Sequence, residues 1–148
     1  IMIQSLKTLF LRDLNKLKKE IESYKEESKL WIIDKNIANS AGNLCLHLIG
    51  NLNTYIGKEL GGTAYIRNRD LEFSQKDIPQ AELLTKIDET ILVVGKALDT
   101  VTEKQLEEEY PVIVFTDKMT TGFFLVHLVA HLDYHLGQIN YHRRLLDV

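Results

Sequence analysis

Three of the five histidines in this 148-residue chain recur every four residues, at His127, His131 and His135. Because a step of four residues turns only about 40° around an α-helix, the three imidazoles lie along one stripe. Phe124 and Leu128 flank this stripe, so we expect it to face the protein interior. Buried imidazoles need a partner on each ring nitrogen and repel one another when protonated. A divalent cation would remove both costs, so a metal site is the first hypothesis.

One helix can supply two of the ligands. Nitrogens from histidines four residues apart reach one zinc ion at about 2.0 to 2.1 Å, whereas a histidine eight residues away lies about 12 Å along the axis. Another ligand must come from elsewhere, and His47 is the obvious candidate because Leu44 and Leu48 place it on an apolar helix face. His142 is a poorer candidate, since it lies in an arginine-flanked terminal turn that we expect to fray.

The same spacing allows two interpretations without a metal. The histidines could form a buried hydrogen-bonded cluster, or their spacing could be fortuitous, and a lone His47 is more often a satisfied core histidine than a ligand. Cys45 is the only cysteine and lies about 200° around the helix from His47. We therefore assign it to the core or the surface and not to the metal.

Four amphipathic segments must position these side chains. Apolar residues at steps of three and four predict helices over about residues 3–26, from Ser40 to Gly61-Gly62, from Pro79 to the acidic run 103–109, and from the threonine caps at 116–121 to about Leu146.

The connections between these helices are expected to be irregular. Residues 28–40 predict a connection in which Trp31 plugs the core, and residues 63–78 predict a long connection without a core element. Residues 111–115 fit either a short extended segment packed on the bundle or an apolar loop patch.

Four apolar stripes are buried most simply in an all-α four-helix bundle, with residues 1–148 as a single domain. A connection of about fifteen residues spans up to about 50 Å when extended, which exceeds the length of a twenty-residue helix. Either long connection can therefore cross the bundle. Spacing alone leaves open whether the order is simple up-down or contains a parallel crossover.

Composition narrows the range of partners. Eighteen Lys and Arg residues against twenty-one Asp and Glu residues give a net charge of -3 without a basic stripe, which argues against nucleic-acid binding. The single cysteine excludes an internal disulfide, and the sequence shows neither a signal segment nor an apolar run of membrane-spanning length. We expect a soluble cytoplasmic protein with neither nucleic acid nor membrane as a partner.

Three segments together resemble the DinB-like superfamily. The closing helix of that superfamily has the pattern H-x3-H-x-G-Q, which is matched by HLDYHLGQI at residues 131–139. Its second-helix histidine segment is similar to AGNLCLHLIGN at residues 41–51. An R-x-R-x-x-E-F loop of one branch resembles YIRNRDLEF at residues 65–73.

The resemblance implies a four-helix bundle of up-down-down-up topology, in which the connection between the second and third helices crosses over. It also implies a divalent metal, often nickel or zinc, held by His47, His131 and His135. Iron is a further option, because imidazole ligands suit it as well. In characterised related proteins the metal serves thiol S-transfer with low-molecular-weight thiols, or maleylpyruvate isomerisation. One departure is Leu136, which stands where an arginine is often found, so any contact of that arginine with an anionic co-substrate is missing here.

The sequence therefore suggests a metal-dependent enzyme for a small molecule, with open coordination positions that suit thiol S-transfer or hydrolysis. Three further residues are expected to lie next to the metal ligands or to line the pocket: His127, Gln138 and Asn51. A further group consists of Arg67, Arg69 and Glu72. Its preferred role is an ion-pair network that anchors the loop, and the other role is binding of an anionic substrate tail.

The alternative is a non-catalytic bundle with a structural metal or a buried histidine cluster, acting as a homodimeric, stress-related protein. Apolar residues 112–115 would suit a dimer contact, and they would equally cover the end of the bundle.

Overall fold

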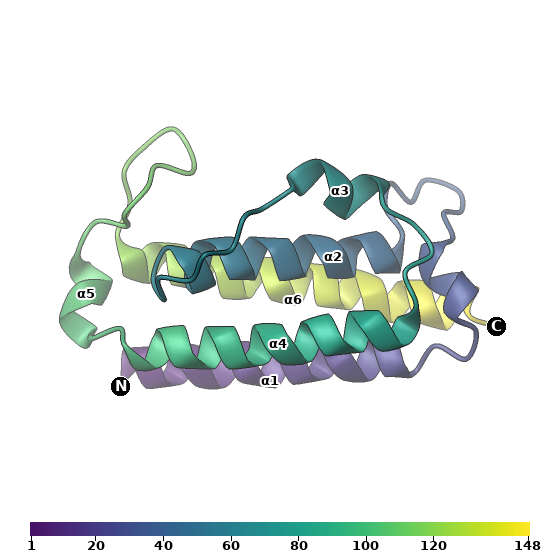
Figure 1. Ribbon diagram of the computed structural model, residues 1–148, viewed down its shortest axis with the longest axis horizontal. Helices are drawn as coiled ribbons and strands as arrows, with labels where there is room; N and C mark the ends of the chain where they lie inside the picture. The colour runs from purple at the N-terminus through teal and green to yellow at the C-terminus, as the bar shows by residue number, and fades with distance from the viewer.

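The computed structural model describes residues 1–148 and contains helices and loops without a strand (Figure 1). Four long helices form its body: α1 (Met2–Glu22), α2 (Ala41–Leu52), α4 (Gln80–Asp99) and α6 (Thr121–Leu146). The shorter elements are a 3₁₀ helix (Glu27–Trp31), a π-helical turn that continues α2 (Asn53–Lys58), α3 (Arg69–Ser74) and α5 (Glu103–Glu107). The predicted all-α bundle is confirmed.

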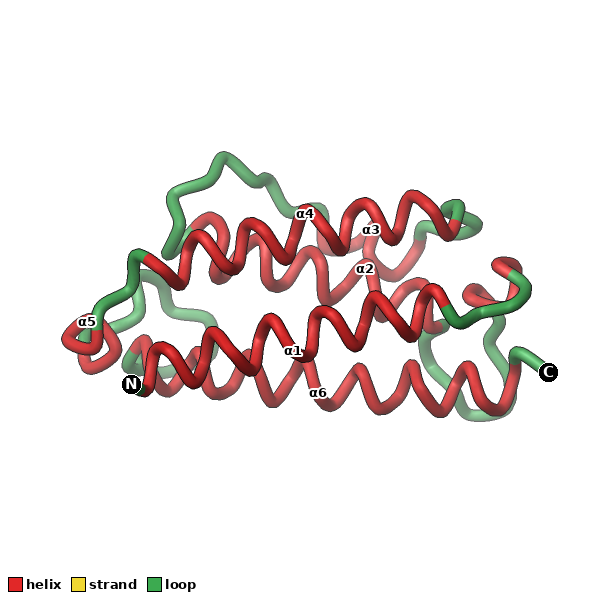
Figure 2. Tube along the Cα trace, turned by 90° about the horizontal axis from the view of Figure 1, so that it is seen from below, coloured by secondary structure: helices red, strands yellow, loops and turns green.

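The long helices follow one another in the order up-down-down-up. Ion pairs show that α1 is antiparallel to α4 and parallel to α6: Lys7–Asp99, Lys18–Asp88, Arg12–Asp133 and Glu20–Arg143. α4 runs parallel to α2 and the π-helical turn that continues it, because Gly57 of that turn lies against Val93 and Gly61, just after it, lies against Ala97. The connection from α2 to α4 therefore crosses the bundle, with α3 on its path (Figure 1). Seen from below, α1 and α4 form one layer in front of α2 and α6 (Figure 2).

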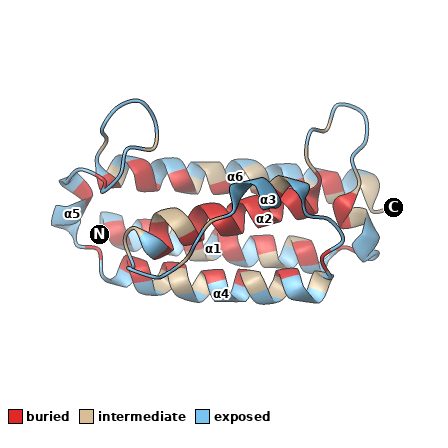
Figure 3. Ribbon diagram, turned by 45° about the horizontal axis from the view of Figure 1, so that its top comes forward, coloured by how far each residue is buried: buried red, intermediate tan, exposed pale blue.

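One hydrophobic core of 32 buried residues joins these helices. α1 contributes a stripe that includes Phe10, Leu14 and Leu17. α2 differs from the other helices, because all 12 of its residues are buried (Figure 3). The cause is its central place, since α4, α6 and α3 all pack against it. None of the helices combines the length and the apolarity that crossing a lipid bilayer requires.

The first helix ends at Glu22, earlier than the predicted end near residue 26. Tyr24 lies beyond the end of the helix and is still buried in the core, with 3% of the residue exposed. The connection that follows places Trp31 in the core, as predicted, with 9% of the residue exposed. Gly42 of α2 makes room for it, because a Cβ there would lie 2.6 Å from the indole ring.

The prediction that residues 63–78 form only an irregular connection is wrong, because α3 forms in the middle of this segment. The side chain of Asn68 caps the start of α3 by accepting a backbone hydrogen bond from its first turn. Asn43 of α2 holds the other end, donating to the carbonyl oxygens of Glu72 and Gln75 at 3.0 and 2.8 Å. α3 is thus held on α2 by polar side chains that follow no periodic pattern in the sequence.

The assignment of the acidic run to the end of the third long helix is also wrong. That helix ends at Asp99, and the run forms the separate helix α5. A capping box starts α5, in which Thr102 and Gln105 each accept a hydrogen bond from the other's backbone N–H. Residues 111–115 form no strand; they lie in a loop in which Ile113 is exposed, which matches the loop-patch interpretation.

His142 does not lie in a frayed turn, contrary to expectation, because 4% of the residue is exposed. Its Nδ1 accepts a hydrogen bond from the hydroxyl of Tyr24 at 2.7 Å, and its Nε2–H donates to the carbonyl oxygen of Ile32 at 2.9 Å. Burial lowers the pKa of His142, and the bond to Ile32 opposes this only in part. With both nitrogens engaged, His142 is a structural residue and not a metal ligand.

His142 is expected to make the stability of the protein depend on pH. Its pKa in the folded protein lies below the unfolded value of about 6.5, so the unfolded chain binds a proton first as the pH falls. The stabilisation is therefore complete above about pH 6.5 and is lost as the pH falls toward the folded pKa. In urea unfolding at about pH 7.5 and 5.5, His142→Gln should lose less stability between the two conditions than the wild type does. An equal loss in both proteins would contradict the assignment.

Candidate metal centre

His47, His131 and His135 lie together where α2 packs against α6. Their ligand atoms are all within 4.8 Å of one another, and Nε2 of His47 is 3.2 Å from Nε2 of His131. His135 meets both rings edge-on, with its centroid 5.3 Å from that of His47 and 4.6 Å from that of His131. The structure thus brings the three residues singled out in the sequence to one point.

The spacing of these nitrogens fits a divalent cation. Two nitrogens bound to one zinc ion at about 2.0 to 2.1 Å in tetrahedral geometry are about 3.3 Å apart. The separation of 3.2 Å between His47 and His131 is close to this value. Imidazole donors suit zinc, nickel, iron and copper alike, so the donor set is compatible with the metals that the resemblance implies.

Glu72 of α3 fixes the orientation of His47. The Nδ1–H of His47 donates to Oε1 of Glu72 at 3.0 Å, which leaves the Nε2 lone pair for an ion. Arg67 binds the same carboxylate twice, through Nε at 2.8 Å and Nη2 at 2.9 Å. Burial alone would raise the pKa of Glu72, but the hydrogen bonds from His47 and Arg67 together outweigh it and lower the pKa. The carboxylate therefore remains charged behind the His47 ring.

The contact between Glu72 and His47 was not predicted from the sequence. We expected one ion-pair network of Arg67, Arg69 and Glu72, and the structure contains the Arg67–Glu72 pair without Arg69. The signal that was available is Gly50, one turn after His47. A Cβ at Gly50 would lie 1.8 Å from Oε2 of Glu72, so glycine leaves the space in which the carboxylate approaches the helix.

Gln138 orients His135 in a similar way. The Nδ1–H of His135 donates to Oε1 of Gln138 at 2.7 Å, and Nε2 remains free. Burial lowers the pKa of His135, with the bond to Gln138 opposing the shift. For His131, burial first and then the neighbouring His135 and His47 lower the pKa to about 4. The imidazoles of His131 and His135 are therefore neutral at pH 7, with lone pairs available to a cation.

The other predicted residues lie around this centre. His127 is exposed, so the expectation that the whole stripe faces inward is wrong for its first member. Its ring lies parallel to that of His131, with 6.2 Å between centroids, and lines a pocket. Asn51 is buried, and its Oδ1 has no hydrogen-bond partner. Cys45 is buried in the core, where burial raises the pKa of its thiol to about 12.

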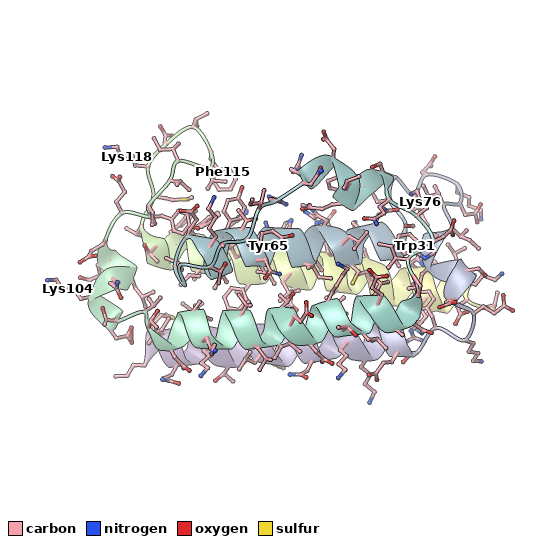
Figure 4. The ribbon with its side chains drawn as sticks, in the orientation of Figure 1. Trp31, Tyr65, Lys76, Lys104, Phe115 and Lys118 are labelled. Atoms are coloured by element: carbon pink, nitrogen blue, oxygen red, sulfur yellow. The ribbon has the colours of Figure 1, made fainter.

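Two pockets adjoin the three histidines. One has a volume of about 370 Å³ and is lined by His47 and His131, with Phe115 of the loop between α5 and α6 on its wall (Figure 4). The other has a volume of about 540 Å³ and is lined by His135 and Gln138. Both volumes fall in the range of small-molecule sites. A small ligand therefore has room beside the candidate ligand atoms.

Nearly the whole chain matches one known protein family. A family model described as "protein of unknown function (DUF1572)" matches residues 2–147. The chain belongs to the DUF1572 family. The matched range includes α2 and α6, which carry the three histidines. No curated protein matches the sequence. Since the family description names no reaction, the function of this DUF1572 protein has to be argued from its site.

Proposed function

We propose that this protein is a divalent-metal-dependent enzyme of the DinB-like superfamily that acts on a small molecule by thiol S-transfer or hydrolysis. One observation carries the proposal: imidazoles from two helices meet within 4.8 Å beside two pockets. Two observations support the assignment to the DinB-like superfamily: the up-down-down-up order of the helices and the three sequence motifs.

His47, His131 and His135 would hold the ion, with nickel and zinc as the first candidates and iron as a further one. Three neutral donors leave the charge of an ion uncompensated and a coordination position free, so the bound ion supplies Lewis acidity that activates a thiol or a water. The protein's own contribution is orientation. Glu72 and Gln138 each accept an Nδ1–H, which keeps the rings of His47 and His135 in the tautomer that presents Nε2.

The size and charge of the site favour a small-molecule substrate, such as one that reacts with a low-molecular-weight thiol. The pocket beside His47 and His131 has a volume of about 370 Å³. The net charge of -3 gives no general attraction for nucleic acid or for an anionic membrane surface.

The competing proposal is a non-catalytic bundle in which a metal stabilises the fold or a homodimer. The exposed loop residues Val112, Ile113 and Phe115 would form the dimer contact. Against a structural role, the three histidines connect only α2 and α6, and a core of 32 buried residues already joins all four long helices. The bundle is therefore expected to keep its fold when the metal is removed.

The test compares the protein before chelation, after chelation and after the metal is restored. Circular dichroism measures helicity, and two assays follow conjugation of glutathione to chlorodinitrobenzene and hydrolysis of a nitrophenyl ester. We expect helicity to persist and one activity to fall at least about tenfold on chelation and to return with the metal. Loss of helicity on chelation without activity in either assay would establish the structural alternative instead. Absence of any bound metal would overturn the metal-dependent enzyme and the structural metal, and would leave the non-catalytic bundle with a buried histidine cluster.

A further inference from the structure

The pocket beside His47 and His131 is lined by positively charged side chains and by no negatively charged one. Its 11 lining residues include two arginines and no carboxylate. We propose, on the basis of the function proposed above, that this pocket selects a small organic carboxylate with an apolar or aromatic body, and that Arg69 binds the carboxylate group.

The two arginines differ in what they have available for a ligand. Arg67 already makes two hydrogen bonds to Glu72, and its side chain is 13% exposed. Arg69 has no carboxylate partner in the protein; its guanidinium lies over the ring of Phe73, 5.4 Å from the centroid. A guanidinium that stacks through its face keeps the N–H groups at its edge free for a bidentate bond to a carboxylate. Arg69 is therefore the cation of the pocket that is open to an anion.

Aromatic residues form much of the remaining wall. The rings of Tyr55 and Phe124 meet edge-on with centroids 5.2 Å apart, and Phe115 lies 6.0 Å from Phe124 in the same arrangement. Tyr55 belongs to the π-helical turn that follows α2, a type of turn that often occurs at functional sites. Such walls suit an apolar or aromatic body, which packs against ring faces and edges.

Asn51 adds a second polar position to this pocket. It is 7% exposed, lines the pocket, and its Oδ1 is buried without a hydrogen-bond partner. A buried polar atom without a partner is unfavourable, and a side-chain amide can donate or accept by turning about its last bond. A turn of the Asn51 side chain that exposes its amide to the pocket would let a polar ligand provide the missing partner. A cationic ligand is disfavoured, because it would face Arg69 without any lining carboxylate to compensate.

The test uses three probes that share one aromatic body and differ in charge: phenylacetate, phenylacetamide and phenethylamine. Binding is measured by calorimetry to chelated protein, because an anion can also bind a metal directly. We expect phenylacetate to bind about tenfold more tightly than the neutral amide, and the amine to bind least. Arg69→Gln should remove most of this preference. Arg144→Gln is the matched control, because Arg144 is also an exposed arginine stacked on an aromatic ring, 5.2 Å from the centroid of Tyr141.

The outcomes separate this proposal from the proposed enzyme function. Equal binding of phenylacetate and its amide, or a preference that survives in Arg69→Gln, would overturn the role of Arg69 and leave the metal site untouched. A loss of preference in Arg144→Gln would place the anion outside the pocket that Arg69 lines and also overturn it. Conversely, a preference that depends on Arg69 in a protein that binds no metal would support the anion site and overturn the metal-dependent function.

Discussion

Replacing His131 by alanine is expected to lower the affinity for a divalent metal at least about 100-fold, because one of three ligands is lost. The wild type should retain about one metal ion per chain after dialysis, and the variant less than about one tenth. His47→Ala should have the same effect, although the two residues are 84 positions apart, since their Nε2 atoms lie 3.2 Å apart. Elemental analysis and competition with a chromogenic chelator measure both quantities.

The matched control is His127→Ala, which removes an imidazole from the same helix one turn earlier. His127 is exposed and does not belong to the group whose ligand atoms lie within 4.8 Å, so this variant should keep its metal. Unchanged metal content in His131→Ala would remove that residue from the ligand set. Circular dichroism of each variant verifies that a lost ion is not the consequence of a lost fold.

The long helices were predictable from sequence because burial imposes a period on them. Steps of three and four residues gave both ends of α6 and the start of α4 within a few positions, whereas α4 ends at Asp99, before the acidic run in which its end was predicted. α3 and α5 were not predictable in this way, because each is only one or two turns long and polar caps start both of them. Their stability depends on contacts with residues distant in sequence, such as those of Asn43 with the carbonyl oxygens of Glu72 and Gln75.

The residues of the candidate site also differ in whether the sequence alone could predict them. Spacing and a family resemblance were enough to single out His47, His131 and His135, because ligand geometry restricts where histidines can lie on two packed helices. The error at His127 has a geometric cause: two steps of four residues turn a helix by about 80°, which carries one end of the stripe out of the α2–α6 contact. The role of Glu72 depends on the path of the crossover, which spacing did not determine.

The second large effect is expected from Gly50→Ala in α2. Alanine usually stabilises a helix relative to glycine, but here the new Cβ would lie 1.8 Å from Oε2 of Glu72. We expect Glu72 to move, which leaves the half-buried guanidinium of Arg67 and Nδ1 of His47 without their partner. We expect a loss of about 2 to 3 kcal/mol in the free energy of unfolding of the metal-free protein. Metal affinity should fall about tenfold to 100-fold, because His47 loses the group that orients it.

Gly137→Ala provides the matched control for this substitution, because it makes the same change in α6 where a Cβ would meet nothing within 4 Å. It should raise stability by about 0.5 to 1 kcal/mol and leave metal affinity unchanged. Glu72→Gln separates the two effects of Gly50→Ala, since it removes the charge behind His47 without the steric conflict. If Gly50→Ala acts on the metal through Glu72, a variant that carries both Gly50→Ala and Glu72→Gln should have about the same metal affinity as the single variant with the lower affinity. Additive losses of metal affinity would show that Gly50→Ala does not act on the metal through Glu72. A stability gain in Gly50→Ala like that of Gly137→Ala would show that α2 tolerates a Cβ at this position.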